Sequence, residues 1–346
     1  MSLITAVRVQ NVRTHKEYSL AISPDITLIT GANGSGKTSL IEALYIALQG
    51  TSFKGVDNDI LTRDAPWYRI DVVLDDQSSR TVKFDPSRPT GRKQFTVDGK
   101  THYRLSQQYK YPMVLFEPED LRLLSGSPTR RRQFIDRFIS QLDPKYVVSL
   151  RRYERALKQR NALLKQRAAS DSMFAWEVSL SEYGAYIILQ RLHFIQELNQ
   201  RLNSVYDTIA HSDDTVYIHY SQAPHDNMQQ KLLADLHTHG ERDALLGFTS
   251  TGPHRHDVLF DFNTSPALAV ASRGEVRSIV LALKFLEVSI IESITNKKPI
   301  VLLDDVFSEL DSSRQDYLIA STKDHQVIIT SATHNSNLQT EYVTRL

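Results

Sequence analysis

Apolar and polar residues alternate along much of the first third of the chain, and this alternation predicts short β-strands. The period of two occurs in residues 3–9, 18–30, 68–74, 81–84 and 94–100. Asp98-Gly99 is a typical two-residue hairpin turn. Residues 113–116 are all apolar and predict a further buried strand. The N-terminal region is therefore expected to be rich in strands.

A different period begins near residue 128. Through residues 128–168 and 174–209, apolar side chains recur at spacings of three, four and seven, the pattern of one helix face. Two such helices, joined near residues 168–171, predict an antiparallel helical hairpin that resembles a short coiled coil. A strand, a polar helix and a turn rich in Gly and Pro are then expected before a second α/β region, at residues 215–220, 225–240 and 250–255.

Residues 31–38 read Gly-Ala-Asn-Gly-Ser-Gly-Lys-Thr, between a β-branched apolar segment and a helical segment. This context is that of a phosphate-binding loop, whereas a chance glycine-rich turn would lack these flanks. Glycines let backbone N–H groups point at one anion, and the helix N-terminus adds positive charge. Lys37 is expected to reach the terminal phosphates and Thr38 to bind Mg²⁺. The predicted triphosphate contacts are Gly31, Ala32, Asn33, Gly34, Ser35, Gly36, Lys37, Thr38 and Ser39.

A second apolar segment, residues 299–303, is followed by Asp304 and Asp305. On a parallel strand beside the phosphate-binding loop, Asp304 is expected to hold Mg²⁺ through water and Asp305 to act as general base. An acidic pair after an apolar strand can also simply begin a loop. Because 267 residues separate Lys37 from Asp304, we expect a large insertion between two adjacent strands. The predicted division is a head of residues 1–116 and 241–346, interrupted by a mainly helical lobe, 117–240.

Two further segments carry candidate anion contacts. Arg13 follows a short predicted strand and is either a solvated turn residue or a second phosphate contact. Ser272-Arg273-Gly274-Glu275 opens a long predicted helix, whose N-terminus favours an anion. A simple helix cap is the alternative for this tetrapeptide.

Charge is balanced overall but unevenly distributed. The chain has 41 Lys and Arg against 40 Asp and Glu, so a nucleic-acid role has to come from a local cluster. Residues 122–167 hold thirteen basic side chains and three acidic ones. Such a cluster suits sequence-independent phosphate contacts, although a solvated helix face is the alternative. The candidate DNA contacts are Arg130, Arg131, Arg132, Arg151, Arg152, Arg155, Lys158 and Arg160.

Composition narrows the class of protein further. The chain has no Cys, which excludes disulfides, thiolate metal sites and cysteine nucleophiles. Its first residues begin like a strand rather than a signal peptide, and no apolar segment approaches the roughly 20 residues that span a bilayer. We therefore expect a soluble, cytoplasmic protein with no membrane contact.

Several segments together carry a family resemblance. They are residues 115–121 (Leu-Phe-Glu-Pro-Glu-Asp-Leu), 126–132 (Gly-Ser-Pro-Thr-Arg-Arg-Arg), 140–144 (Ser-Gln-Leu-Asp-Pro), 153–164, 251–255 (Thr-Gly-Pro-His-Arg) and 303–306 (Leu-Asp-Asp-Val). With the phosphate-binding loop, they resemble the ABC-type ATPases of chromosome maintenance (SMC, Rad50 and RecF proteins), and RecF in particular. The resemblance implies an α/β ABC-type ATPase head with a mixed sheet, plus an inserted helical lobe and no long coiled coil.

The resemblance also implies cofactors and partners. ATP and Mg²⁺ would bind, and two chains would form a head-to-tail homodimer around two ATP molecules. Ser272, Gly274 and Glu275 of one chain would face the phosphate-binding loop of the other, and Arg13 would contact the nucleotide. RecF proteins bind DNA, as duplex or at a single/double-strand junction. They act in the nucleoid at gapped or damaged replication sites, with RecR and RecO, to help load the RecA recombinase.

The sequence departs from the family pattern in three places. Arg273 lies inside residues 272–275, which correspond to the signature segment of the family. Relatives usually carry another polar residue at this position. Glu117 occupies the position expected for the Q-loop glutamine. Ser331 occupies the position of the switch histidine, and His334 follows three residues later. The last departure weakens the expectation of fast hydrolysis more than that of family membership.

We therefore predict an ATP-gated DNA clamp that is reset by slow hydrolysis through Lys37, Asp304 and Asp305. Turnover is expected to be slow because Asp305 is shorter than the glutamate of many ABC enzymes. A small-molecule phosphotransferase is one alternative, but it leaves the signature and the basic cluster unexplained. A second alternative is an ATP-gated protein-interaction scaffold without direct DNA binding.

Overall fold

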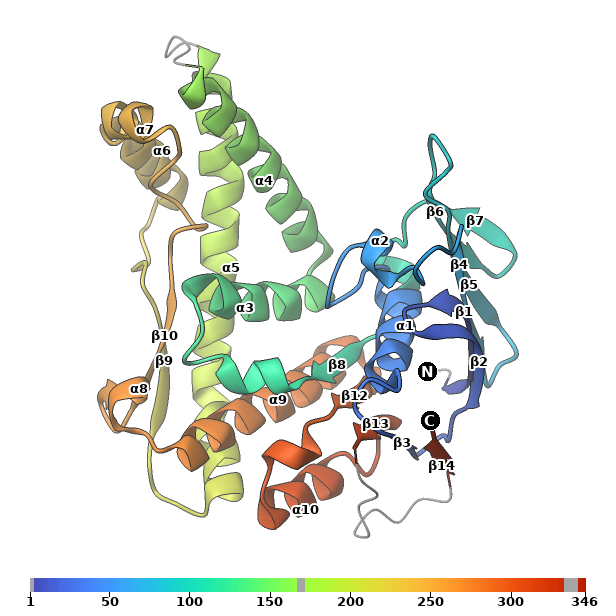
Figure 1. The fold of residues 1–346 in the computed structure, drawn as a ribbon. Helices are drawn as coiled ribbons and strands as arrows, with labels where there is room; N and C mark the ends of the chain where they lie inside the picture. Colours follow the sequence, from blue (N-terminus) through green and yellow to red (C-terminus); the bar gives the residue numbers. More distant parts are fainter. Residues whose placement is uncertain (1–2, 167–171, 333–341) are drawn as a thin grey trace. The chain divides into compact units, whose positions relative to one another are not determined.

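The computed structural model describes residues 3–166, 172–332 and 342–346 (Figure 1). The chain forms two compact units, one of residues 1–120 with 287–346 and the other of residues 121–286. The predicted boundary at residue 240 is thereby corrected to 286. The reason is that α7 (Gly240–Leu246) packs against α4 (Pro144–Lys165), and β10 (Val258–Phe262) pairs with β9 (Val216–Tyr220).

The first unit contains an antiparallel sheet of six strands in the order β2-β1-β4-β5-β6-β7. The expected hairpin is present, because Asp98 and Gly99 both have positive φ angles (48° and 76°) between β6 and β7. Arg13, with a φ of 53°, lies in the tight turn between the first two strands. The strands are β1 (Ile4–Val12), β2 (His15–Ala21), β4 (Tyr68–Leu74), β5 (Ser79–Phe84), β6 (Lys93–Val97) and β7 (Lys100–His102).

A second sheet of the same unit has five parallel strands in the order β14-β3-β13-β12-β8. The expectation that the strand before the phosphate-binding loop and the strand before the acidic pair are adjacent is wrong. β13 lies between them and pairs with both. The strands are β3 (Ile26–Thr30), β8 (Met113–Phe116), β12 (Ile300–Asp304), β13 (Val327–Ser331) and β14 (Tyr342–Arg345).

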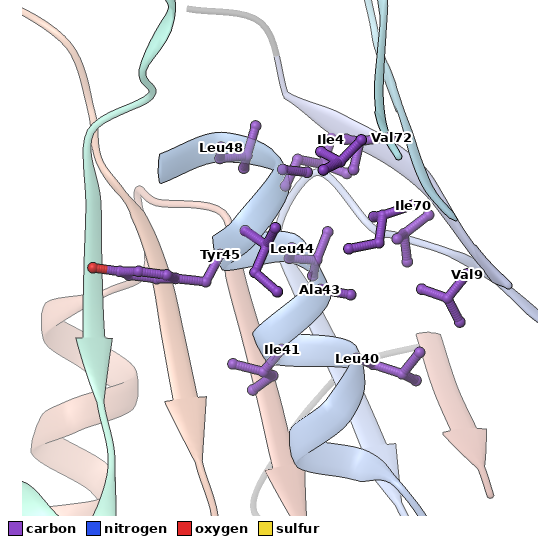
Figure 2. Close-up of a cluster of buried hydrophobic side chains, with 14 of the residues drawn as sticks. Ile4, Val9, Leu40, Ile41, Ala43, Leu44, Tyr45, Leu48, Ile70 and Val72 are labelled. Carbon is purple, nitrogen blue, oxygen red and sulfur yellow. The ribbon is translucent and has the colours of Figure 1, made fainter. Parts of the chain in front are cut away.

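Helix α1 (Lys37–Gln49) lies between the two sheets and is buried on nearly all sides. This explains why its sequence is apolar around most of its circumference rather than along one stripe. Figure 2 shows Leu40 and Leu44 among side chains from the antiparallel sheet such as Val9 and Ile70. The shorter elements of this part of the chain are α2 (Asp57–Ile60), η1 (Gln107–Tyr109), η2 (Pro118–Arg122), η4 (Phe307–Glu309) and α10 (Ser312–Ser321).

The second unit is mainly helical. The segment expected to form one helix from residue 128 is divided in two, because Asp143 caps a new helix whose first residue is Pro144. α4 packs against the long helix α5 (Phe174–Ala210) as the predicted hairpin requires, while the predicted junction at 168–171 lies outside the described residues. The other elements are α3 (Pro128–Leu142), α6 (Met228–Thr238), α8 (Ala267–Val270) and β11 (Ser265–Pro266).

Helix α9 (Arg273–Thr295) begins in the second unit and ends in the first, where it leads into β12. Within the described parts of the chain, no helix combines the length and apolar character needed to cross a bilayer.

Candidate nucleotide-binding site

The predicted phosphate-binding loop connects the end of β3 to the start of α1. Gly36 has a φ of 102°, and a Cβ atom there would lie 2.3 Å from His15 Nε2. Only glycine fits this position, since both the backbone conformation and the available space exclude a side chain. His15 Nε2 also lies 3.0 Å from the Gly36 carbonyl oxygen, so the first residue of β2 holds the loop in place.

Lys37 is the first residue of α1, and its side chain is only 4% exposed. Its ammonium group donates hydrogen bonds to the carbonyl oxygens of Gly31 (2.8 Å) and Ala32 (3.2 Å). The same nitrogen lies 4.0 Å from Asp305 Oδ2. The predicted phosphate-binding lysine and one of the two predicted acids are therefore in one place.

Thr38 and Asp304 are in direct contact although 266 positions separate them in the sequence. The Thr38 hydroxyl donates to Asp304 Oδ1 over 2.8 Å, and the Asp304 side chain is 2% exposed. Hydroxyl and carboxylate oxygens are ligands that Mg²⁺ takes beside substrate phosphates. These two side chains therefore fit a magnesium ion.

Asp305 has a left-handed backbone with a φ of 54°. Its N–H donates to the Thr330 hydroxyl over 2.9 Å, and the same hydroxyl lies 2.9 Å from Asp304 Oδ1. Asp305 Oδ1 is buried and has no hydrogen-bond partner among the described residues. An unpaired buried carboxylate oxygen is unfavourable for stability, which is typical of a group kept for chemistry.

Sequence reasoning missed two residues of this site. Thr330 is the second-to-last residue of β13, and the strand order that brings it between the two acids is not visible in the sequence. Lys54 follows α1, and its Nζ lies 3.4 Å from Asp304 Oδ2. The only sequence signal for Lys54 was a basic residue in the connection after the loop helix. Nothing in the local pattern distinguished it from an ordinary surface lysine.

Arg13, a predicted nucleotide contact, forms an internal ion pair. Its Nε and Nη2 donate to the two carboxylate oxygens of Glu42 over 2.9 and 3.0 Å. Its Nη1 donates to the Asp59 carbonyl oxygen over 2.6 Å. The hydrogen bonds to Glu42 raise the pKa of Arg13. Arg13 thus ties the β1–β2 turn to α1, and its contact with a nucleotide stays a prediction.

The signature segment forms a capping box at the start of α9. The Ser272 N–H donates to Glu275 Oε2 over 2.6 Å, and the Glu275 N–H donates to Ser272 Oγ over 3.3 Å. The helix-cap interpretation is therefore confirmed. Ser272 is exposed and Gly274 is partly exposed. A role for this segment opposite a triphosphate in another chain stays a prediction.

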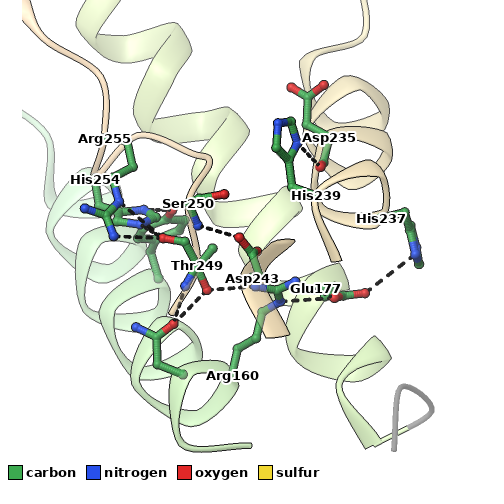
Figure 3. A network of polar contacts seen from close by, with 12 residues as sticks. Arg160, Glu177, Asp235, His237, His239, Asp243, Thr249, Ser250, His254 and Arg255 are labelled. Atoms are coloured by element: carbon green, nitrogen blue, oxygen red, sulfur yellow. Dashed lines mark hydrogen bonds and ion pairs between the residues drawn. The ribbon is translucent and has the colours of Figure 1, made fainter. Parts of the chain in front are cut away.

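Arg160, a predicted DNA contact, is completely buried, so this prediction is wrong. Figure 3 shows its guanidinium between Glu177, Asp243 and Thr249, at 3.0, 2.7 and 2.9 Å. Three separate segments supply these partners. Through these hydrogen bonds, Arg160 connects α4 to α5, to α7 and to the turn that follows α7, all inside the second unit.

The prediction for Arg131 is also wrong. Its guanidinium forms a two-point contact with the carboxylate of Asp257 (2.9 and 2.7 Å) and is buried. Arg132 donates to the His256 carbonyl oxygen, and burial lowers its pKa. Arg130 is partly exposed, and the exposed candidates lie on α4, at Arg151, Arg152, Arg155 and Lys158.

The structure places two of the positions that depart from the family pattern. Glu117 is buried after β8, and its N–H donates to Asp120 Oδ2. Ser331 is buried at the end of β13. His334 lies outside the described residues.

The sequence matches known proteins over nearly its full length. The sequence model of the family described as RecF/RecN/SMC N terminal domain matches residues 3–346. The DNA replication and repair protein RecF of Thermomicrobium roseum is 33% identical, over 99% of this chain and 96% of the relative. The chain belongs to the RecF family. The RecF protein of Agathobacter rectalis is 32% identical over 95% of this chain and 91% of its own.

Solved structures agree with the family assignment. The recombination mediator protein RecF with ATP, of the RecFOR pathway, has 28% identity and a TM-score of 0.88, over 99% of this chain and 95% of that one. An SMC head domain from Pyrococcus furiosus is 15% identical with a TM-score of 0.52, which shows the shared fold alone. The predicted fold class, an ABC-type ATPase head with a helical lobe, is confirmed. RecF and SMC proteins are a family of ABC-type ATPases, and this chain is one of its members.

Proposed function

We propose that this RecF-family chain is an ATP-dependent DNA-binding protein of recombinational repair and replication-gap processing. The contact between Thr38 and Asp304 carries the proposal. It joins the phosphate-binding loop to the predicted magnesium ligand, although the inserted lobe separates the two residues in the sequence. The relatives named as replication and repair proteins support the biological setting. The RecF structure with ATP supports ATP as the nucleotide.

The site residues have distinct roles in the proposed hydrolysis. The loop N–H groups and Lys37 bind the phosphates, while Thr38 and Asp304 hold Mg²⁺. Bound Mg²⁺ supplies charge neutralisation at the terminal phosphates. Asp305 orients the attacking water and accepts its proton on the carboxylate. Because Asp305 is short, we expect slow turnover, and a steady-state rate of tens per second would contradict this expectation.

ATP would act by joining two copies of the chain. Ser272, Gly274 and Glu275 at the start of α9 would bind the triphosphate held by the other copy, as a helix N-terminus with exposed donors can. The exposed basic residues of α4 would then contact DNA phosphates without reading bases. RecR and RecO are the proposed partners in loading RecA, in the cytoplasm on the nucleoid.

The decisive experiment is a gel-shift titration of the full chain with duplex and gapped DNA, with and without ATP. We expect ATP-dependent binding that weakens with salt and that is lost in Lys37→Arg and Asp304→Asn. Lys100→Arg is the matched control for Lys37→Arg, since Lys100 is exposed on β7 outside the site. Unchanged DNA retention in Asp304→Asn would refute the coupling between ATP and DNA.

An ATP-gated protein scaffold is the second candidate. One observation favours it, namely that two of the eight predicted DNA contacts, Arg131 and Arg160, serve the interior of the lobe. The same titration separates the two functions, because a scaffold would dimerise with ATP but leave the DNA unshifted at every salt concentration.

A further inference from the structure

A pocket of about 310 Å³ lies on the antiparallel sheet of the first unit. It is lined by side chains of β1, β4, β5 and β6 and of the loop that follows β5. None of its lining residues belongs to the phosphate-binding loop, the acidic pair or the basic helix α4. Four of them are cations, against one acid, Asp85.

The floor of the pocket is a row of polar residues in strand register. Gln10 pairs with Arg69, Arg69 with Lys83, and Lys83 with Gln94. Residues directly opposite each other in neighbouring strands share one face of the sheet, and two like charges in such a pair are destabilising. The Arg69–Lys83 pair is therefore not explained by the stability of the sheet.

The two cations of this pair differ in their contacts. Arg69 forms a two-point ion pair with Asp71 on the same strand, at 2.7 and 2.8 Å. The exposed Lys83 side chain has neither an ion pair nor a hydrogen bond with any described residue. Lys83 is thus a positive charge in the pocket that is available to a ligand.

The loop after β5 places two more cations at the edge of the pocket. It is closed by a hydrogen bond of 2.8 Å from the Asp85 N–H to the Arg92 carbonyl oxygen. Arg88 lies 3.3 Å from Asp85 and is half exposed, while Arg92 Nε donates to the Arg88 carbonyl oxygen. The internal bonds of the loop hold both residues at the edge of the pocket that Lys83 also lines, and guanidinium groups suit a phosphate.

Trp67 provides an aromatic surface beside these cations. It is 40% exposed, although tryptophan is mostly buried in folded proteins. Its carbonyl oxygen accepts a hydrogen bond of 3.1 Å from Asn11 Nδ2, which fixes the backbone just before β4. An exposed aromatic ring next to a basic groove is the arrangement on which unpaired bases stack.

We propose that this pocket binds one unpaired nucleotide of a single-stranded nucleic acid. The phosphate lies against Lys83, Arg88 and Arg92, and the base stacks on the Trp67 indole. A duplex does not fit this arrangement, because its bases are already stacked on one another inside the helix. The proposal rests on the proposed DNA-binding function and adds to it a contact within the ATPase head.

Trp67 itself reports on this binding. The chain has two tryptophans, so the Trp176→Phe protein keeps Trp67 as its single indole fluorophore. Titration with a thymidine oligonucleotide of about 12 nucleotides is expected to quench its emission to saturation. An abasic oligonucleotide of the same length is expected to bind about tenfold more weakly, because it retains the phosphates and lacks the stacking base.

Variants separate the pocket from general electrostatics. Lys83→Glu is expected to abolish the quenching and Lys83→Arg to retain it. Lys100→Glu makes the same charge change at an exposed position of β7 outside the pocket and is expected to leave the quenching intact. Equal losses in Lys83→Glu and Lys100→Glu, or the absence of saturable quenching, would overturn the proposal.

Two further arms identify the ligand and separate this proposal from the proposed function. The proposed strand ligand would be wrong if thymidine monophosphate or inorganic phosphate quenched at the same concentration as the oligonucleotide. The pocket would then be a site for a free ligand. ATP-dependent retention of duplex DNA by the full chain is measured in parallel. If it persists while the quenching fails, only the pocket proposal is wrong. If it fails while Trp67 still responds to the strand, the pocket stands and the DNA clamp does not.

Discussion

Thr330 connects the two acids of the site through a single hydroxyl group. It accepts a hydrogen bond from the Asp305 N–H and lies within hydrogen-bond distance of Asp304 Oδ1, both at 2.9 Å. Since Thr38 contacts the same Asp304 oxygen, the orientation of one carboxylate depends on two hydroxyl groups from different elements. The left-handed backbone of Asp305 is also held by this contact.

Thr330→Val keeps the shape of the side chain and removes the hydroxyl. We expect ATP hydrolysis to slow by about ten- to a hundredfold, because a lost hydrogen bond to a charged group is worth roughly 1.5–3 kcal/mol. ATP binding should change less, since Lys37 and the loop remain. Single-turnover hydrolysis and nucleotide titration measure the two effects. Thr322→Val is the matched control, as its hydroxyl donates to Leu318 in the same unit; an equal loss of hydrolysis there would contradict the role of Thr330.

His254 contributes a dependence of stability on pH. Its Nδ1 faces the Tyr153 hydroxyl at 2.7 Å and its Nε2 faces the Thr249 carbonyl oxygen at 3.0 Å, which suits the neutral ring. Burial lowers the pKa of His254 to about 4, and that of His256 likewise to about 4. Both values lie below about 6.5, the ordinary value for an unfolded chain.

As the pH falls, the two histidines bind protons in the unfolded chain before they do so in the folded chain. Their contribution to the free energy of unfolding is therefore complete above about pH 6.5 and is lost as pH falls toward 4. We expect the free energy of unfolding to decrease by on the order of 1 kcal/mol per pH unit for each histidine in this range. Urea denaturation at pH 7 and pH 5 measures the change. His254→Gln should show a smaller pH dependence, and an identical dependence would contradict this assignment.

Helix α4 carries its basic residues on two sides with different roles. Tyr153, Ala156, Arg160 and Leu164 are buried at spacings of three and four, whereas Arg155 and Lys158 are exposed. The buried side includes the Arg160 ion pairs, which replace apolar packing where α5 and α7 meet it. A single helix therefore serves both the interior of the lobe and a surface suited to phosphates.

Arg160→Met tests this division. Removing the guanidinium leaves the carboxylates of Glu177 and Asp243 buried without their partner, a change that costs roughly 3–5 kcal/mol. Arg155→Met makes the same substitution on the exposed side and should change stability by less than about 0.5 kcal/mol. Chemical denaturation of both variants measures the difference, and similar losses would show that Arg160 does not hold the lobe together.

The proposed function depends on two copies of the chain. Ser272 both caps α9 and is predicted to face a triphosphate, and the two roles separate by substitution. Ser272→Asp keeps a good cap, so stability should be retained, but its negative charge opposes a phosphate. We expect ATP-dependent dimerisation to be lost, as measured by sedimentation with and without ATP.

Ser272→Ala provides the comparison. It removes the cap and should cost about 1 kcal/mol of stability, with a smaller effect on the dimer because no charge is added. ATP-dependent dimers that form normally in Ser272→Asp would show that this segment is a cap and nothing more.

Local patterns predicted the strands, the loop, the acidic pair and the helical lobe because each depends on residues close in sequence. They did not predict that β13 separates β3 from β12, since strand order follows from pairing between distant segments. They also could not distinguish Arg160 from Arg155. The two residues have the same chemistry, and only the distant Glu177 and Asp243 determine which one is buried.

The position of β13 also determines when the nucleotide site can form during synthesis. The phosphate-binding loop leaves the ribosome early, and α1 can follow it at once. The strand that holds the loop and the acids in register is residues 327–331, so the growing chain carries the loop without its acidic partners for most of translation. Contacts between such distant segments form late and slowly. A nascent head is therefore expected to lack the complete nucleotide site until β13 has emerged.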